Sequence, residues 1–479
     1  MLTQNPKSTN PPTFIFVLLA LGLTLRVAFA FWVSKYYFGD VRFTFGDSFS
    51  YTQAFINLVQ HGTYTFDPSN PDAALYRGPT YPFFWGAHYL VFGEELAYKA
   101  VALSQSLLDT ISGFFVFLII RNLSHSIRLA ILGAALYLFN PIFFVHVPIT
   151  GTETFATFLT LLIFYLSVRP DFKYKLLMIG ALCALAVMTR QYLGLLLPAT
   201  MLYIFATSHF QLTRKLLTNL LTLTLGFCLV VSPWFFRNLV NHGVPTILMG
   251  GTSGYTSYQS DYTAFNKFYI LYYFDITPIY KSIAIDGRDG LVDKQSVADL
   301  ADYRGRLDHA AALAHECGPS FRSWRETLSG KKQEIGRDCT EEVVKAYTEL
   351  RQEVLDRNGW RLLHKVPFEN VQKAIFKSDL TASVDGWKGL AIQTIFFART
   401  LLDLMGIAFI VMAFSTPAAA FLFFPLTLIL YLSAVTQQVE MRYLVQSDAI
   451  LIVFAVLFIG ALRFRILNRV NKPRTAHQP

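Results

Sequence analysis

Long apolar runs recur along the whole chain, and they constrain its fold more than any other feature. A helix needs about 20 apolar residues to cross the roughly 30 Å hydrocarbon core of a membrane. Only 15% of the 479 residues are charged and 53% are hydrophobic, whereas a soluble domain carries about 25% charge. The sequence therefore predicts an all-α polytopic membrane protein. Ten membrane spans are expected, at residues 13–33, 96–120, 128–148, 152–168, 174–190, 191–209, 215–235, 388–413, 416–434 and 443–462.

Basic residues indicate the orientation of these spans. If the N-terminus is cytoplasmic, the inside segments hold thirteen Lys and Arg residues and a single acid, Asp171. This asymmetry follows the positive-inside rule and places both termini, including the basic tail 463–479, in the cytoplasm. It also accounts for the net charge of +9, so the charge gives no reason to expect a nucleic-acid partner. No Walker loop, GxGxxG motif or zinc-finger spacing indicates a nucleotide, cofactor or metal site.

The same topology puts two long segments on the outer face. Residues 34–95 form a loop inside an N-terminal membrane module (1–235), and residues 236–387 are long enough for a small domain before the last helices (388–462). The late segment has a helical pattern between 291 and 378. It contains Cys317 and Cys339, for which an oxidising compartment favours a disulfide. Two unpaired thiols are the alternative.

The first outer loop is predicted to hold two amphipathic helices, near 48–61 and 80–92, each followed by glycine. Their aromatic faces suit helices that lie in the plane of the membrane interface. Asp47 directly precedes the first of them. It is either a helix cap that accepts a backbone hydrogen bond or a general base at the membrane surface.

Further polar residues fall at the outer ends of several spans, and arginines gather there although the positive-inside rule predicts few. Arginine binds phosphate through a planar fork of donors, so an anionic ligand such as a lipid phosphate is expected on this face. A carboxylate beside such a cluster stays ionised and can accept a proton from a hydroxyl. This combination describes glycosyl transfer from a polyprenyl-phosphate sugar. The span-end residues are Glu153, Arg190, Trp234, Arg237, Asn238, Glu440, Arg442 and Tyr443, and Arg77 lies near them in the first outer loop.

Each of these positions also has a structural interpretation. Arginines at span ends commonly extend toward the interface, and an acid such as Glu153 is favoured at a helix N-terminus by the dipole. Trp234 suits an interfacial aromatic belt. Arg26 and Asp109 fall within the first two spans, where an unpaired charge is costly, and could pair with each other.

Six motifs give the chain a family resemblance. DSFSY with NLVQHGTYTFD, RGPTYPFF, TETF, TRQ, SPWFFRN with HG, and EMRYL follow one another from residue 47 to 444. In this order they resemble GT-C fold glycosyltransferases of the protein O-mannosyltransferase and aminoarabinose lipid A transferase kind, especially the bacterial group similar to lipopolysaccharide galacturonosyltransferases. The resemblance covers nearly the whole chain.

The resemblance implies a fold and a chemistry. Asp47 would be the catalytic base and Glu153 a second acid, while Arg77, Arg190, Arg237, Arg442, Tyr81 and Trp234 would bind the donor phosphate or sugar. The donor would be a polyprenyl-phosphate monosaccharide, transferred with inversion and without a metal or other cofactor. Two departures weigh against the protein-mannose and aminoarabinose assignments. Ser48 follows Asp47 where protein mannosyltransferases have a second acid, and Arg77-Gly78-Pro79 replaces a lysine-proline signature.

Other functions remain open at this stage. An O-antigen polymerase or ligase would also act on the outer face but would use a diphosphate donor. A lipid-linked-sugar transporter would share the arginines, yet it favours two halves with broken spans, and the unequal outer segments do not suggest such halves. Lipid A, a core glycan, a cell-wall glycan and a protein are all candidate acceptors. The expected location is a bacterial cytoplasmic membrane with the site on its periplasmic or extracellular face.

Overall fold

The computed structural model describes residues 13–248, 260–273, 276–289, 300–329, 336–376, 386–413, 416–435 and 439–470. Within these residues every regular element is helical, which confirms the predicted all-α class. Six apolar helical segments are long enough to cross a membrane, and four shorter apolar helices of 10–17 residues overlap the remaining predicted spans. The chain is therefore a multi-pass membrane protein. The predicted tail lies largely outside the described residues, from 471 onward.

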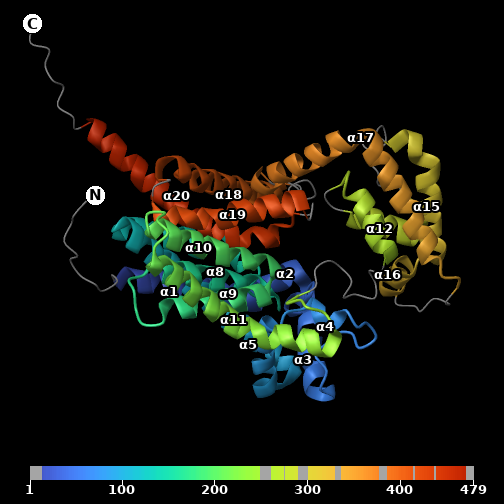
Figure 1. The fold of residues 1–479 in the computed structure, drawn as a ribbon, viewed down its shortest axis with the longest axis horizontal. Helices are drawn as coiled ribbons and strands as arrows, with labels where there is room; N and C mark the ends of the chain where they lie inside the picture. Colours follow the sequence, from blue (N-terminus) through green and yellow to red (C-terminus); the bar gives the residue numbers. More distant parts are fainter. Residues whose placement is uncertain are drawn as a thin grey trace, which may run out of the picture.

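The membrane helices form one elongated bundle (Figure 1). Its helices are α1 (Thr13–Ala28), α5 (Thr80–Ser124), α6 (Ile127–Leu138), α8 (Thr152–Val168), α9 (Lys175–Thr189), α10 (Leu196–Thr207), α11 (Arg214–His242), α18 (Gly386–Ala413), α19 (Phe423–Leu430) and α20 (Met441–Val470). Short connecting helices are η1 (Phe29–Val33), α2 (Ser34–Phe38), η2 (Gly39–Phe43), α7 (Pro141–Phe144), η3 (Gln191–Leu195), η5 (Pro417–Leu422) and η6 (Tyr431–Val435).

One predicted span is broken. The segment 128–148 was expected to be a single helix, but α6 ends at Leu138 and the short α7 begins at Pro141. Proline lacks the backbone N–H that would continue α6, and the Asn140 side chain instead accepts a hydrogen bond from the Ile142 amide at 3.1 Å. The chain therefore leaves the helical path at the end of α6, and this irregular stretch becomes part of a cavity wall described below.

Small residues and buried ion pairs hold the bundle together. A Cβ at Gly180 would lie 2.0 Å from a carbonyl oxygen of α11, so α9 and α11 pack with their backbones in contact, as small residues allow in membranes. Arg26 and Asp109 form the expected pair at 2.6 Å, with side chains at most 1% exposed. Tyr137 donates a hydrogen bond to the same carboxylate at 2.5 Å. This cluster joins α1, α5 and α6.

A second buried cluster joins α18 to α20. Arg399 makes two hydrogen bonds to Asp448, at 2.8 and 2.9 Å, and approaches Asp403 at 3.3 Å. It also donates to the carbonyl of Ala374 at 2.9 Å. All three charged side chains are 3–4% exposed. Because Ala374 lies near the end of the long helix α17 (Thr340–Phe376), the cluster anchors the outer domain to the membrane bundle.

The late outer segment folds as a small helical domain with its own core. Its elements are α12 (Ser260–Tyr269), α13 (Thr277–Asp286), η4 (Ala301–Tyr303), α15 (Arg304–Cys317), α16 (Pro319–Ser329) and the first part of α17. Phe265, Phe268 and Tyr347 are fully buried in an aromatic core. Cys317 and Cys339 form a disulfide with their Cα atoms 5.4 Å apart, which links the end of α15 to the residue before α17.

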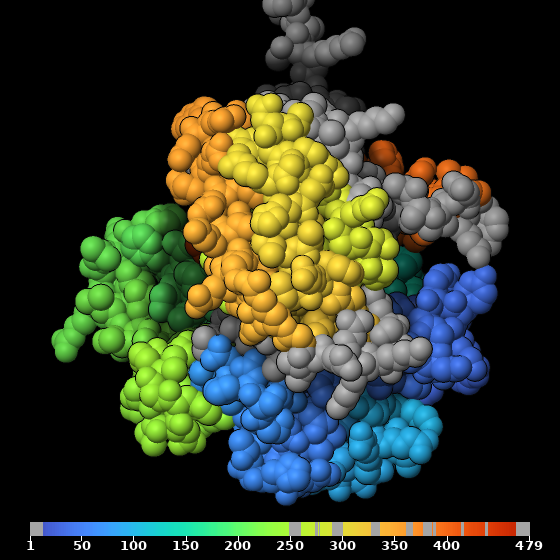
Figure 2. All heavy atoms as spheres, turned by 90° about the vertical axis from the view of Figure 1, so that its right-hand side faces the viewer, coloured from blue at the N-terminus to red at the C-terminus, as the bar shows by residue number. Residues whose placement is uncertain are grey.

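The first outer loop carries α3 (Ser48–His61) and α4 (Ala73–Tyr76), followed by the first part of α5. The two predicted interfacial helices are both present, and Gly62 ends α3 in a left-handed conformation. Gly93 has φ +73° inside α5 and separates the interfacial part from the membrane span. Helices α2, α3 and α4 lie toward the same end of the bundle as α12 and α16 (Figure 1). Figure 2 shows this end of the molecule, with the outer domain in front of the bundle and the first loop beside it.

Candidate active site

Asp47 stands at the start of α3, and its carboxylate faces two arginines. Oδ1 lies 3.6 Å from Nη2 of Arg77, and Oδ2 lies 3.0 Å from Nη1 of Arg442. The side chain makes no capping hydrogen bond to α3. The cap interpretation of Asp47 is therefore wrong, because its carboxylate pairs with two arginines and accepts no hydrogen bond from α3.

The two guanidinium groups determine the charge of Asp47. Burial by itself raises the pKa of this carboxyl, but the positive charges of Arg77 and Arg442 outweigh burial and hold the pKa below its ordinary value. An opposite charge at this range favours the ionised form. Asp47 is thus a carboxylate over the physiological pH range, as a general base requires.

Arg77 is fixed by the helix that Asp47 begins. Its Nε donates to Ser50 Oγ at 2.8 Å and its Nη1 to the Tyr51 hydroxyl at 2.9 Å. The guanidinium also lies over the Tyr51 ring, 4.3 Å from its centroid. These contacts leave Arg77 13% exposed. Arg77 is therefore held by the first outer loop in a position where its positive charge faces Asp47.

Gly78 brings the loop against the membrane bundle. A Cβ on this residue would lie 1.9 Å from the carbonyl oxygen of Met188, near the end of α9. The Tyr64 hydroxyl donates toward the carbonyls of Arg77 and Gly78, at 3.0 and 3.1 Å. The absence of a side chain at position 78 thus lets Arg77 approach the end of α9, where Arg190 lies.

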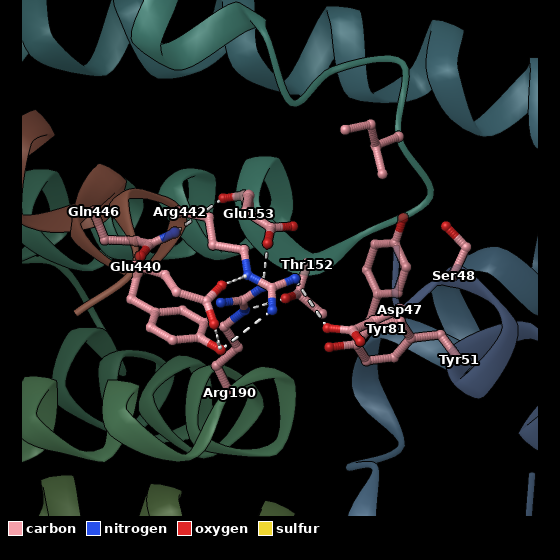
Figure 3. A network of polar contacts seen from close by, with 12 residues as sticks. Asp47, Ser48, Tyr51, Tyr81, Thr152, Glu153, Arg190, Glu440, Arg442 and Gln446 are labelled. Atoms are coloured by element: carbon pink, nitrogen blue, oxygen red, sulfur yellow. Dashed lines mark hydrogen bonds and ion pairs between the residues drawn. The ribbon is translucent and has the colours of Figure 1, made fainter. Parts of the chain in front are cut away.

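Glu153 and Arg190 form a buried pair between α8 and the end of α9. Their side chains are 7% and 9% exposed, and Arg190 also donates to the Thr152 hydroxyl. The third donor direction of Arg190 meets the Tyr192 hydroxyl at 3.2 Å. Because each nitrogen of the guanidinium has a side-chain partner, Arg190 has a fixed orientation at the edge of the site (Figure 3).

Arg442 reaches the site from the start of α20. Its three donor directions meet Glu440 at 2.5 Å, Asp47 at 3.0 Å and the Tyr443 hydroxyl at 3.3 Å. The Tyr443 ring lies 5.2 Å from the guanidinium of Arg442 and 5.3 Å from that of Arg190. Residues almost 400 positions apart thus form one network of polar contacts (Figure 3).

A cavity of about 540 Å³ opens beside this network. Asp47, Glu153, Arg190 and Arg442 lie in its polar part. Most of the remaining wall is apolar and comes from the first loop, the broken span and α18. These wall residues include Tyr37, Phe38, Phe45, Pro141, Ile142, Val145, Ile149, Ile392, Ile395 and Phe396. The cavity therefore combines charged side chains with an apolar wall, which suits a ligand that has both kinds of surface.

Four predicted donor-binding residues lie outside the cavity lining, namely Arg77, which pairs with Asp47 from behind the lining, and the three described next. Arg237 donates to the carbonyls of Ala74 and Tyr64, at 2.9 and 3.0 Å, and so braces the first loop. The Trp234 indole donates to the Ile247 carbonyl at 3.0 Å and packs against the Tyr64 ring. Tyr81 is fully buried, and its hydroxyl donates to Gln105 at 2.9 Å. Their contacts are structural, although Tyr81 packs on Tyr51 beside the site.

Several residues of the network were not predicted. Tyr192 donates to Gln446 at 3.0 Å, and Gln446 in turn donates to the Glu153 carbonyl at 3.1 Å, which joins α8 to α20. Tyr51 could have been found, since it lies one helical turn after Asp47. Arg399, Asp403 and Asp448 were also missed, although charges inside predicted spans are a recognised functional signal. His146 also lines the cavity.

The described part of the chain contains no evident set of metal ligands. There, no three His, Cys, Asp or Glu side chains converge in a way that could hold an ion. The expectation that transfer needs no metal or cofactor stays a prediction.

Comparisons with known proteins agree with the fold. Residues 76–236 match the family described as dolichyl-phosphate-mannose-protein mannosyltransferase. No match was found among curated proteins. The oligosaccharyltransferase AglB from Archaeoglobus fulgidus, solved in complex with an inhibitory peptide and a dolichol-phosphate, is 13% identical with a TM-score of 0.51. The alignment covers 96% of this chain and 52% of that one, so the chain spans about half the length of this relative.

Two further solved structures are similar. The apo form of the same archaeal enzyme has a TM-score of 0.51 at 13% identity, covering 97% of this chain and 53% of that one. ArnT from Cupriavidus metallidurans bound to undecaprenyl phosphate has a TM-score of 0.39 at 13% identity, covering 98% and 82%.

Proposed function

The chain has the GT-C fold of membrane glycosyltransferases, and from this premise we propose that it transfers a monosaccharide from a polyprenyl-phosphate donor to an envelope acceptor. The observation that carries the proposal is the cavity that Asp47, Arg190 and Arg442 line together with apolar side chains. A polyprenyl-phosphate sugar has the matching parts, namely an anionic phosphate, a polar sugar and an apolar chain. The dolichol-phosphate named in the archaeal structure belongs to the same chemical class.

In the proposed reaction the acceptor hydroxyl oxygen attacks the anomeric carbon of the donor sugar. The new bond forms from the acceptor oxygen to this carbon, while the bond from the carbon to the phosphate oxygen breaks and leaves its electron pair on the phosphate. The hydroxyl proton passes to Asp47. Because attack comes from the side opposite the leaving group, the anomeric configuration inverts.

The arginines of the cavity would stabilise the leaving phosphate. Arg442 is the more accessible candidate, with 30% of its side chain exposed against 9% for Arg190. Charge that develops on the leaving oxygen is best stabilised by donors that are already oriented, and both guanidinium groups are held by neighbouring side chains. Glu153 is assigned the supporting role of orienting Arg190, with which it is paired.

The proposed location is a bacterial cytoplasmic membrane, with the cavity on the non-cytoplasmic side. The positive-inside asymmetry supports this orientation. Thiol labelling of the variants Ser69→Cys and Arg169→Cys tests it. The cysteine at position 69 is expected to react from outside, and the cysteine at position 169 only from the cytoplasm. The reverse pattern would place the cavity on the cytoplasmic face and contradict the orientation.

The function is tested with purified protein in detergent. The native enzyme should consume a synthetic undecaprenyl-monophosphate sugar when an envelope glycolipid extract supplies the acceptor, and the Asp47→Asn variant should not. Use of the corresponding diphosphate donor instead would contradict the proposal and favour a polymerase or ligase. Mass spectrometry of envelope glycolipids from a deletion strain then identifies the sugar by the hexose, pentose or uronate mass that is lost.

A further inference from the structure

Glu440 is a third carboxylate of the polar network, and the reaction described above gives it no role. One oxygen accepts from Arg442 Nε at 2.5 Å, and the other accepts from the Tyr443 hydroxyl at 3.3 Å. The residue lies just before α20, two positions from the arginine that it contacts. Glu440 thus fixes both Arg442 and Tyr443 from the side away from Asp47.

Arg442 is shared between two acids. Glu440 holds its Nε edge, whereas Asp47 takes Nη1 at a longer distance of 3.0 Å. Of the three arginines nearest Asp47, Arg442 is also the most exposed. It is therefore the guanidinium that an incoming phosphate reaches with the least rearrangement.

The pairing of Asp47 conflicts with its proposed task. Both carboxylate oxygens face a guanidinium, and a base must turn one of them toward the acceptor hydroxyl. A donor phosphate at Nη1 of Arg442 would take the place of Oδ2 and release that oxygen. Arginine binds phosphate and carboxylate through the same fork of donors, so the two compete for it.

We propose that Glu440 is a positioning residue which holds Arg442 at the cavity while the donor phosphate displaces Asp47 from it. This inference rests on the proposed function. Donor binding and release of the base are then one event, which makes Asp47 free to act only when a donor is present. Glu440 allows the exchange because its contact with Nε is separate from the contact that is replaced.

The test measures binding of undecaprenyl phosphate to detergent-purified variants by native mass spectrometry. Glu440→Gln should raise the dissociation constant about 10-fold, since a charge-assisted contact is lost, while turnover at saturating donor changes much less. Asp47→Asn should bind the lipid phosphate more tightly than native protein, because the competing carboxylate is gone. Glu95→Gln, an exposed acid of the same loop, is the matched control and should bind like native protein.

A double-mutant comparison distinguishes positioning from a general structural effect. If Glu440 acts through Arg442, adding Glu440→Gln to Arg442→Gln should change binding by less than about twofold. Additive losses, or unchanged binding by Glu440→Gln alone, would overturn the positioning role. Weaker binding by Asp47→Asn would overturn the exchange. If native protein binds no lipid phosphate at all, the donor class of the proposed function is what fails.

Discussion

Nη1 of Arg442 lies 3.0 Å from Oδ2 of Asp47, so the first residue of the polar network touches one that follows it by 395 positions. This contact closes the site between the first outer loop and the last membrane helix. The role of each residue depends on the other, because the loop supplies the carboxylate and the helix supplies the guanidinium that neutralises it. The predictions below separate their roles.

Asp47→Asn should lower turnover by about 10²–10⁴-fold, the usual contribution of a general base. The midpoint of thermal unfolding should change little, and the same holds for Asp47→Ala, because the side chain caps no helix amide and, at 36% exposed, its ion pairs are partly solvated. Product formation per folded molecule and thermal unfolding in detergent are the two measurements. Near-native turnover in the Asn variant would remove the catalytic assignment.

Arg442→Lys should weaken binding of the lipid phosphate, since a lysine keeps the charge but loses the two-pronged geometry. Arg237→Lys is the contrasting variant, because Arg237 contacts backbone carbonyls of the first loop. It should leave donor binding nearly native and lower the unfolding temperature instead. Equal loss of donor binding in both variants would show that the division between cavity and brace is mistaken.

The acid limb of the pH profile should lie low. The pKa of Asp47 is held below its ordinary value of 3.8 by Arg77 and Arg442, so the carboxylate persists as the pH falls and kcat/KM should decline only below that value. Arg77→Gln removes one positive charge, which raises the pKa and should move the acid limb to higher pH. The measurement is kcat/KM against pH for both proteins. An acid limb that stays in place would mean that Asp47 is not the titrating group.

The two aspartates beside Arg399 should differ in importance. Asp448 makes two hydrogen bonds to the guanidinium, whereas Asp403 approaches it once at 3.3 Å. Removing one partner of a buried ion pair typically costs roughly 3–5 kcal/mol, so Asp448→Asn should destabilise the protein strongly and Asp403→Asn only slightly. Thermal unfolding of the two isosteric variants decides the matter, and the opposite order would refute the assignment.

Replacing Cys317 and Cys339 with serine should destabilise the outer domain by roughly 2–4 kcal/mol, the usual contribution of a closed loop. Peptide mapping without reductant should recover the two cysteines as one linked peptide in native protein. In limited proteolysis, the outer domain of the double serine variant should then be cleaved faster than that of native protein. Two alkylatable thiols in protein taken directly from membranes would contradict the linkage.

Much of the architecture could be predicted because membranes impose simple rules. Apolar length gave the spans, and the glycines at 62 and 93 marked the ends of the interfacial helices. The gathering of Asp47 with Arg77, Arg190 and Arg442 followed from placing them on one face. Sequence patterns could not distinguish Arg237 from these residues. An arginine that binds backbone carbonyls and an arginine that faces a cavity can both occur at the outer end of a span.

The missed features depend on pairing between distant helices. Arg399 and Asp448 neutralise each other only because α18 packs along α20, and no periodicity within either helix indicates that partner. The wall of the cavity could not be predicted for a similar reason, because its residues come from segments far apart in the sequence. Pro141 interrupts the third span, but only the packed structure turns the interruption into a surface for a ligand.

Gly78 gives the Arg-Gly-Pro triplet a structural requirement that can be recognised in a sequence. Its missing side chain lets the loop backbone touch the carbonyl of Met188, with no room for even a methyl group. A relative that kept the arginine and the proline but carried a larger residue between them could not hold its loop at this separation from the fifth span. In surveys of related sequences, the identity of this single position should therefore separate chains with this assembled site from chains that merely have a basic outer loop.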